Sequence, residues 1–167
     1  MKATFKLITV LFITLLVSCG GKEEKKKEKF SYQKKAVTEQ TTTPKTEKTL
    51  ASKKVDLENK GVGPIKSVDL SAAVNQEIVA HGADVYKKMC TACHRTDRKF
   101  VGPAPTGILK RRSPEWVMNM ILNPEQMVKE DPLAKELLIE FNGSPMANQG
   151  LTEEDARAVL EYFRTLK

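Results

Sequence analysis

The chain has 167 residues, three cysteines, two histidines and a net charge of +7. This length suggests one domain, and the charge is unevenly spread. Residues 20–60 hold 12 lysines against seven acidic residues, whereas residues 61–167 hold 14 basic and 14 acidic residues. The basic excess therefore belongs to the N-terminal part, which argues against a basic, nucleic-acid-binding folded domain.

Residues 1–18 have the pattern of a secretory signal peptide. Two lysines precede an apolar run over residues 7–17, which is too short to span a bilayer as a stable helix. The run ends in the sequence LVSC at residues 16–19, which resembles a bacterial lipobox and predicts that Cys19 is lipidated and becomes the mature N-terminus. An ordinary signal peptide whose cleavage site happens to contain cysteine is the alternative.

The next segment is rich in Lys, Glu, Thr, Gln and Ser. From Gly20 to about Lys60 it has hardly any large apolar residues, so nothing offsets the entropy lost on ordering. We therefore expect residues 19–72 to be a disordered tether between the lipid anchor and a folded domain. Its lysines suit anionic lipid headgroups, whereas an exported protein has no obvious access to nucleic acid.

Helical periodicity marks residues 73–167, and no stretch alternates as a strand does. The predicted helices begin at capping side chains, three of them followed by proline: Ser71 or Asn75, Ser113-Pro114, Asn123-Pro124, Asp131-Pro132 and Thr152. The first of these helices ends near Met89. Asn142-Gly143 supplies a stop signal, and Thr152 with Asp155 forms a variant of the capping box. The sequence therefore predicts an all-α domain.

The pentapeptide Cys90-Thr91-Ala92-Cys93-His94 has the spacing that attaches a c-type haem. Two sulfurs three residues apart can reach the two vinyl groups on one porphyrin edge and form thioethers. The histidine that follows can present an imidazole nitrogen to the iron. One covalent haem c is therefore the predicted cofactor, bound through Cys90 and Cys93 with His94 as an iron ligand.

Two other sites use the same residue types. A zinc site would need two more ligands, and the only other histidine is His81, which is expected to lie on the surface. A thioredoxin-like cysteine pair would need a strand before the motif, and none is predicted.

Further features around the motif carry a family resemblance. Gly82, Tyr86 and Cys90 follow one another at intervals of four, Gly102-Pro103 stands eight residues past the motif histidine, and a loop at residues 145–152 enters the last helix. With the pentapeptide, these features resemble the class I cytochromes c over about residues 74–167.

This resemblance implies a class I cytochrome c fold, with helices packed around one haem. It implies that Gly82 lets the C-terminal helix cross closely, and that Tyr162 packs at the crossing. It also implies that the carbonyl oxygen of Pro103 accepts a hydrogen bond from the imidazole of His94 and so fixes its tautomer.

The second iron ligand is expected to be one of the six methionines. Met146 lies in a Gly/Pro/Ser-rich loop whose extended backbone can point a thioether at the iron, and it is the predicted ligand. Met127 is the main competitor, whereas Met118 and Met120 are expected to be packing residues of a helix. Pro145 precedes Met146, although many relatives have proline after the ligand.

A cationic run, Lys110-Arg111-Arg112, precedes the predicted Trp116 helix. These cations, Arg111 foremost, and the Trp116 indole are candidate partners for the haem propionates. A solvated loop and a core tryptophan are the alternative.

Ligation by His94 and Met146 would fill both axial positions, which suits one-electron transfer and not bond chemistry, so no enzyme activity is expected. We expect a lipid-anchored monohaem cytochrome c outside the cytoplasm, at the periplasmic face of a membrane or on the cell surface. Its donor would be a quinol-oxidising complex or another cytochrome, and its acceptor an oxidase or reductase. The alternatives are a haem c subunit of an oxidase or reductase complex, and a sensor or peroxidase with an open sixth site.

Overall fold

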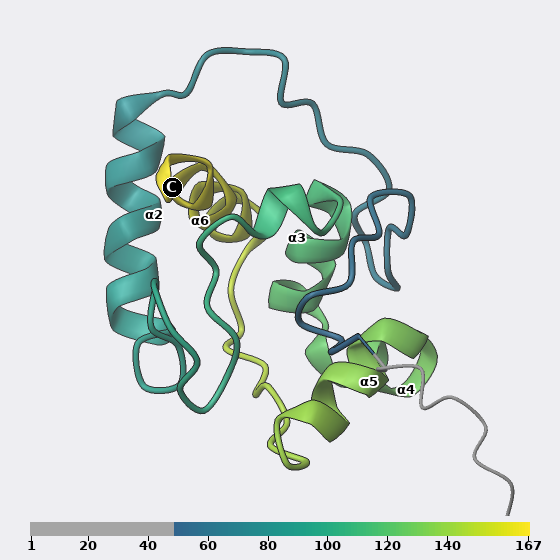
Figure 1. Cartoon of the computed structure of the whole chain (residues 1–167). Helices are drawn as coiled ribbons and strands as arrows, with labels where there is room; N and C mark the ends of the chain where they lie inside the picture. Colours follow the sequence, from purple (N-terminus) through teal and green to yellow (C-terminus); the bar gives the residue numbers. More distant parts are fainter. Residues whose placement is uncertain (1–48) are drawn as a thin grey trace, which may run out of the picture. The chain divides into compact units, whose positions relative to one another are not determined.

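The computed structural model describes residues 49–167; the predicted signal peptide, Cys19 and most of the predicted tether lie outside this range. Its helices, shown in Figure 1, are α2 (Gln76–Met89), the short 3-10 helix η1 (Ile108–Lys110), α3 (Pro114–Leu122), α4 (Pro124–Glu130), α5 (Pro132–Glu140) and α6 (Glu153–Thr165). Over these 119 residues the only β-pairing is one isolated bridge between Asp56 and Arg112. The prediction of an all-α domain is confirmed. No helix in this range has the length and apolar character needed to cross a membrane.

The predicted helix starts are confirmed, and most of them use the predicted caps. The side chains of Ser113 and Asp131 each accept a hydrogen bond from the backbone N–H three residues later, at 3.1 and 2.7 Å. Thr152 and Asp155 bond reciprocally in a capping box. Asn123 is the exception, because its side chain makes no capping bond at the start of α4.

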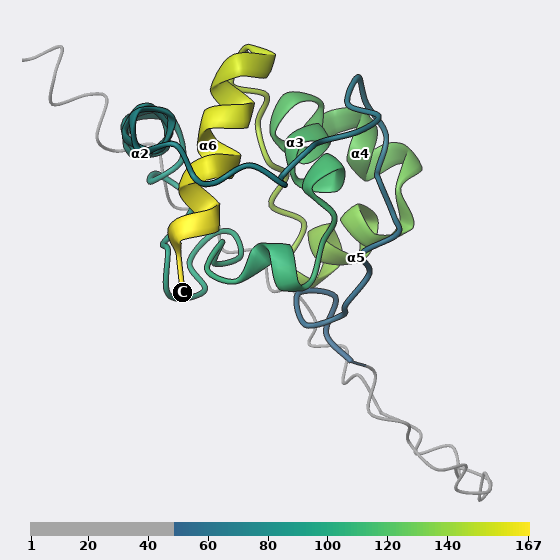
Figure 2. The same ribbon diagram turned by 90° about the horizontal axis from the view of Figure 1, so that it is seen from above.

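Helices α2 and α6 cross closely, as both ribbon views show (Figures 1 and 2). At the crossing, a Cβ atom on Gly82 would lie 1.9 Å from the carbonyl oxygen of Ala158, so only glycine fits. The ring of Tyr86 packs beside those of Tyr162 and Phe163, with centroid distances of 5.5 and 5.8 Å. The expected role of Gly82 and the expected packing of Tyr162 are both confirmed.

Helices α3, α4 and α5 lie on the other side of α6 from α2 (Figure 2). Their inward faces supply most of the buried apolar side chains, which form one core with α6; its buried members include Trp116, Val117, Met127, Ala134, Val159 and Leu160. A cavity lies between the two helical groups, lined by the end of α2 and by residues of α3 and α5.

Residues 49–70, here called the N-terminal strap, correct the predicted tether. They form the dark-blue segment of Figure 1, which runs beside α3, α4 and α5 before it reaches α2. Ile65 is buried, and its N–H and carbonyl oxygen both bond the side chain of Asn119, at 2.9 Å each. Nη2 of Arg112 donates to the carbonyl oxygen of Ala51 at 2.6 Å.

The expectation of disorder was therefore wrong for residues 49–72. It counted only the apolar residues within the segment. The segment is ordered because side chains far along the chain, chiefly Asn119 and Arg112, bond its backbone and so compensate for its few large apolar residues.

Candidate functional site

The Cys90–His94 motif forms a tight turn at the C-terminal end of α2. The N–H groups of Cys93 and His94 both donate to the carbonyl oxygen of Cys90, at 3.1 and 2.9 Å. Both thiols are free, and burial raises the pKa of Cys90 to about 11, so this thiol is uncharged at neutral pH. The turn brings both sulfurs and the imidazole of His94 to the wall of one cavity.

The imidazole of His94 is held by the loop that follows the motif. Nδ1 of His94 lies 2.8 Å from the carbonyl oxygen of Pro103. Because a carbonyl only accepts, Nδ1 carries the proton and Nε2 keeps a free lone pair. A Cβ on Gly102 would lie 2.4 Å from Cε1 of His94, so the backbone there lies directly against the ring. The contact expected for Pro103 is present.

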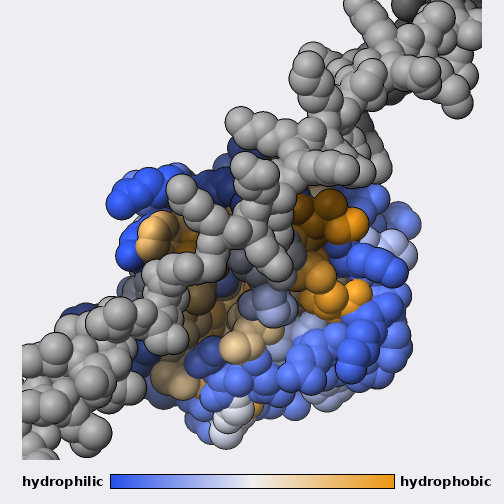
Figure 3. All heavy atoms as spheres, turned by 90° about the horizontal axis from the view of Figure 1, so that it is seen from below, coloured by the Kyte–Doolittle hydropathy of each residue, from blue (hydrophilic) through white to orange (hydrophobic). Residues whose placement is uncertain are grey.

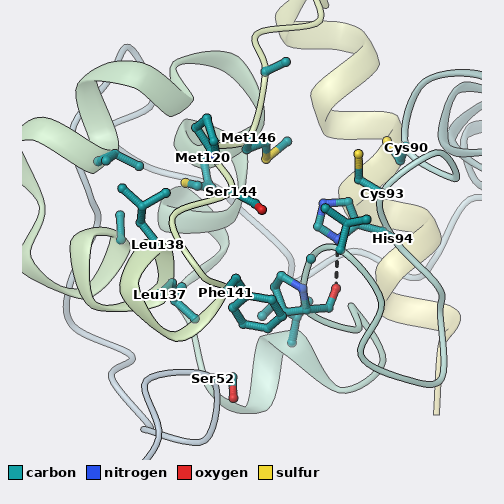
Figure 4. A pocket seen from close by; sticks show the side chains of 18 of the residues that line it. Ser52, Cys90, Cys93, His94, Met120, Leu137, Leu138, Phe141, Ser144 and Met146 are labelled. Atoms are coloured by element: carbon teal, nitrogen blue, oxygen red, sulfur yellow. Dashed lines mark hydrogen bonds between the residues drawn. The ribbon is translucent and has the colours of Figure 1, made fainter. Parts of the chain in front are cut away.

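The cavity, together with the open space at its mouth, has a volume of about 1120 Å³. Its mostly apolar lining comes from all the helices except α6, from η1 and from the loops after α2 and α5. A second cavity of about 550 Å³ shares seven lining residues with it: Cys90, His94, Pro103, Ile108, Trp116, Met120 and Met146. Figure 4 shows Cys90, Cys93 and His94 on one side of the first cavity and Met120 and Met146 on the other. The two sides leave an apolar space between the imidazole and the thioethers.

The two methionines considered as the second iron ligand occupy different places in the structure. Met146 lines both cavities, opposite His94. Met127 is fully buried at 0% exposure and lines neither; its sulfur accepts a hydrogen bond from the N–H of Val62 at 3.0 Å. Met120, which was expected only to fill space, also lines both cavities and was missed as a site residue.

Two arginines line the first cavity. The guanidinium of Arg111 donates to the carbonyl oxygens of Thr106 and Gly107, and that of Arg112 donates to two carbonyl oxygens of the strap. The Nε–H of each is buried without a partner, and neither arginine forms a salt bridge within residues 49–167. Arg112 is only 2% exposed, and burial lowers its pKa.

The carboxylates of Asp56, Asp131 and Glu140 stabilise the charge of Arg112 from a distance, but none of them pairs with it. A buried cation with no paired anion is costly, so an anion beside these arginines would be stabilised. Haem propionates are such anions. Arg111 is thus brought to the cavity as predicted, and Arg112 joins it. Both arginines belong to the cationic run that the sequence offered as candidate propionate partners.

Trp116 also lines the cavity, but not with the role that was expected. Its indole N–H donates to Oδ1 of Asp131 at 3.1 Å, so that donor is already used. Trp116 therefore contributes the apolar face of its ring to the wall and links α3 to the start of α5. The idea that its N–H binds a propionate is corrected.

Ser52 of the strap lines the same cavity and was missed. Its N–H and hydroxyl both donate to the carboxylate of Glu140, at 2.8 and 2.5 Å, which fastens the strap to α5. No sequence signal could have found it, because it lies in a Lys/Thr-rich stretch outside any motif.

His81 takes no part in the site. Its Nε2 lies 3.0 Å from Oδ1 of Asp155, and it is nine residues from Cys90 along α2, about 13 Å at helical rise. Over residues 49–167, no three His, Cys, Asp or Glu side chains gather in a way that could hold a metal ion. The surface position expected for His81 is confirmed.

Haem c requires two thiols at the attachment spacing, an imidazole with a free nitrogen, an apolar slot and a place for two carboxylates. Cys90, Cys93 and His94 meet the first two requirements, and the cavity with its arginines meets the others. The fold and the site together define a c-type haem protein.

The chain belongs to the cytochrome c family, whose model matches residues 79–167. A cytochrome c from Rhodothermus marinus is 38% identical, with a TM-score of 0.61 over 70% of this chain and 93% of that chain. An engineered cytochrome c from the same organism, Rma TDE, gives 0.60 at 38% identity over 70% and 94%. Rma TDE bound to a carbene intermediate gives 0.58 at the same identity and coverage. No curated protein matches.

These likenesses confirm the class I cytochrome c fold and the covalent haem c, and they make haem-based electron transfer the activity of this domain. The structural match covers 70% of the chain, whereas residues 79–167 are just over half of it. It therefore extends to residues before Val79.

Proposed function

We propose that the protein is a lipid-anchored monohaem cytochrome c that carries single electrons between extracytoplasmic respiratory partners, with iron bound by His94 and Met146. The positions of His94 and Met146 in the structure support this pair of iron ligands. His94, with Nε2 free, and Met146 line the same cavity from opposite sides. Met127, the competing ligand, has its sulfur in the core.

When bound, haem c supplies an iron that gains or loses one electron with little rearrangement. The residues of the chain support this. The Pro103 carbonyl fixes the tautomer and ring plane of His94. The thioether of Met146 is a neutral, soft ligand that favours the reduced state. With His94 and Met146 both holding the iron, no place would be left for a substrate, so the proposed protein would be a carrier and not an enzyme.

An absorption spectrum of the matured protein, oxidised and reduced, with and without carbon monoxide, tests this assignment. We expect the weak sulfur–iron(III) charge-transfer band at the edge of the near infrared, and little binding of carbon monoxide. Rapid binding of carbon monoxide by the wild type would contradict the carrier proposal and favour a sensor or peroxidase-like role.

A redox partner would approach where the cavity reaches the surface. Met89 and Val101 line the cavity and are also exposed, and the neighbouring Phe100 is 48% exposed. Figure 3 shows apolar side chains gathered on the lower face of the molecule, with hydrophilic side chains around them. Exposed apolar residues beside the site suit a docked protein, and a lasting complex would make the chain a subunit of an oxidase or reductase. Copurification from solubilised membranes separates a fixed subunit from a free carrier.

The proposed lipid anchor is inferred from residues 16–19 of the sequence alone, because Cys19 lies outside the described residues. Full-length protein should be recovered with membranes, and Cys19→Ser should release it without changing the haem spectrum. A mature wild type that is wholly soluble without detergent would remove the anchor from the proposal and leave the haem site untouched.

A further inference from the structure

The segment that carries Met146 is weakly attached to the rest of the domain. Among residues 145–150, here called the methionine loop, the hydrogen bonds are internal: Gln149 donates to Ala147, and Gly150 donates to Asn148. None joins the loop to another part of residues 49–167. Most of its residues are exposed.

Two glycines in the left-handed region bound this segment: Gly143, two residues before the methionine loop, and Gly150, its last residue. Gly143 has φ 73° and Gly150 has φ 64°, and a Cβ on either would meet nothing within 4 Å. Both corners therefore stand in open space. Met146 is the one residue of this loop whose side chain packs against the core, although Pro145, Ala147 and Gln149 also line the cavity. The methionine loop is therefore held mainly by Met146 and can swing out once that contact is lost.

Met120 is a second thioether at the same place, but on a rigid support. It lies on α3, whose start is capped by Ser113. The preceding residue, Asn119, is fully buried and makes three hydrogen bonds to Lys60 and Ile65 of the strap. Met120 lines both cavities with Met146, on the side opposite His94 (Figure 4).

The other methionines differ. Met89 lines only the first cavity, next to the attachment motif on the His94 side, and Met118 and Met127 line neither. Met120 is thus the one further thioether, among residues 49–167, that lies with Met146 on the wall facing His94. Methionine has three rotatable side-chain bonds, so a change of rotamer moves its sulfur without moving the helix.

We infer that Met120 is a reserve iron ligand, which takes the sixth position when Met146 leaves it. The inference rests on the proposed ligation by Met146. In this exchange one sulfur–iron bond breaks and another forms, with no transfer of electrons or protons. The methionine loop can then open, for example against a docked partner, while the iron stays closed to water and small ligands.

Three leucine variants test this, because leucine keeps the volume of methionine but cannot bind iron. They are Met146→Leu, Met120→Leu and the double variant; Met118→Leu, on the same helix but outside the cavities, is the matched control. The readouts are the sulfur–iron(III) band, the rate of carbon monoxide binding, and the upfield methyl resonance of iron-bound methionine in protein labelled with ¹³C-methyl methionine.

Met120→Leu and Met118→Leu should both keep the wild-type band and methyl resonance. Met146→Leu should keep a displaced band, with the methyl resonance now from Met120. The double variant should lose both and bind carbon monoxide at least tenfold faster than Met146→Leu.

Loss of the band in Met146→Leu alone would overturn the reserve ligand and leave Met146 as the sole thioether ligand. Loss in Met120→Leu with retention in Met146→Leu would instead overturn the proposed ligation by Met146. If Met146→Leu does not mature, wild type and Met120→Leu are compared in denaturant just strong enough to open the loop. Carbon monoxide should bind Met120→Leu at least tenfold faster, and equal rates would overturn the inference.

Discussion

Arg112 joins the haem site to the strap through one side chain. It lines the cavity with an unpaired Nε–H, while its terminal nitrogens bond the carbonyl oxygens of Ala51 and Lys54. A substitution here acts twice, because it frees the strap and removes a positive charge from beside the haem.

Arg112→Leu should therefore lower the free energy of unfolding by about 2–6 kcal/mol, because the carbonyl groups of Ala51 and Lys54 lose their donor, at about 1–3 kcal/mol each. It should also lower the midpoint potential, since a nearby positive charge disfavours the more positive, oxidised state. Guanidinium denaturation and a redox titration measure the two effects. Lys110→Ala, which removes an exposed charge of the same run, is the control; an equal fall in potential there would contradict a specific role for Arg112.

At the scale of elements, the crossing of α2 and α6 depends on a missing side chain. The atom that a Cβ on Gly82 would strike, at 1.9 Å, belongs to the backbone of α6, which cannot rotate away as a side chain would. Gly82→Ala should therefore destabilise the domain by about 1–3 kcal/mol or more through overpacking. Thermal unfolding compared with Asp84→Ala, an exposed position on α2, checks this; a melting temperature equal to that of the control would show that the helices separate easily.

The strap is the element with the largest expected effect. A chain that begins at Asn75 lacks Ala51 and Ile65 from the core and Ser52 from the cavity wall, and it leaves Arg112 and Asn119 without their carbonyl partners. Each unsatisfied buried group costs about 1–3 kcal/mol, so a loss of several kcal/mol is expected in guanidinium denaturation. A chain that begins at Thr49 is the matched control and should keep full stability. Equal stability of the two truncations would contradict a structural role for the strap.

The elements also show what sequence could predict. Helix starts were foreseen because Ser113, Asp131 and Thr152 act on backbone groups only three residues away. The motif was foreseen because its spacing is local, and the Pro103 contact was foreseen from the resemblance to the class I cytochromes c. The strap was not, because its order comes from Asn119, some 54 residues beyond Ile65.

The same limit applies inside the site. Met120 and Ser52 reach the cavity only through tertiary packing, and neither carries a local signal. Trp116 does line the cavity, as predicted, but its indole N–H donates to Asp131, 15 residues away. No pattern in the sequence predicted this hydrogen bond. Side chains that act across the fold are thus the ones that sequence reasoning missed or misassigned.

At the scale of the whole molecule, the excess positive charge and the haem site lie in different parts of the chain. Residues 61–167 carry equal numbers of basic and acidic residues, and the lysine excess lies before them. The haem domain is small, and covalent haem stays on the unfolded chain, so the cofactor would stabilise the domain through the apolar contacts and the Met146 ligation that only the folded state makes. A neutral domain on a basic N-terminal segment fits a carrier whose docking depends on apolar contact near the haem more than on long-range attraction.

A redox titration of the matured wild-type protein, followed by absorbance and repeated under carbon monoxide, tests the central claim most directly. One haem with both axial positions filled by side chains should give a single, reversible one-electron transition whose midpoint is the same with and without the gas. A ligand that binds only reduced iron raises the midpoint by mass action, so an upward shift under carbon monoxide would show an open sixth position and contradict the electron-carrier account.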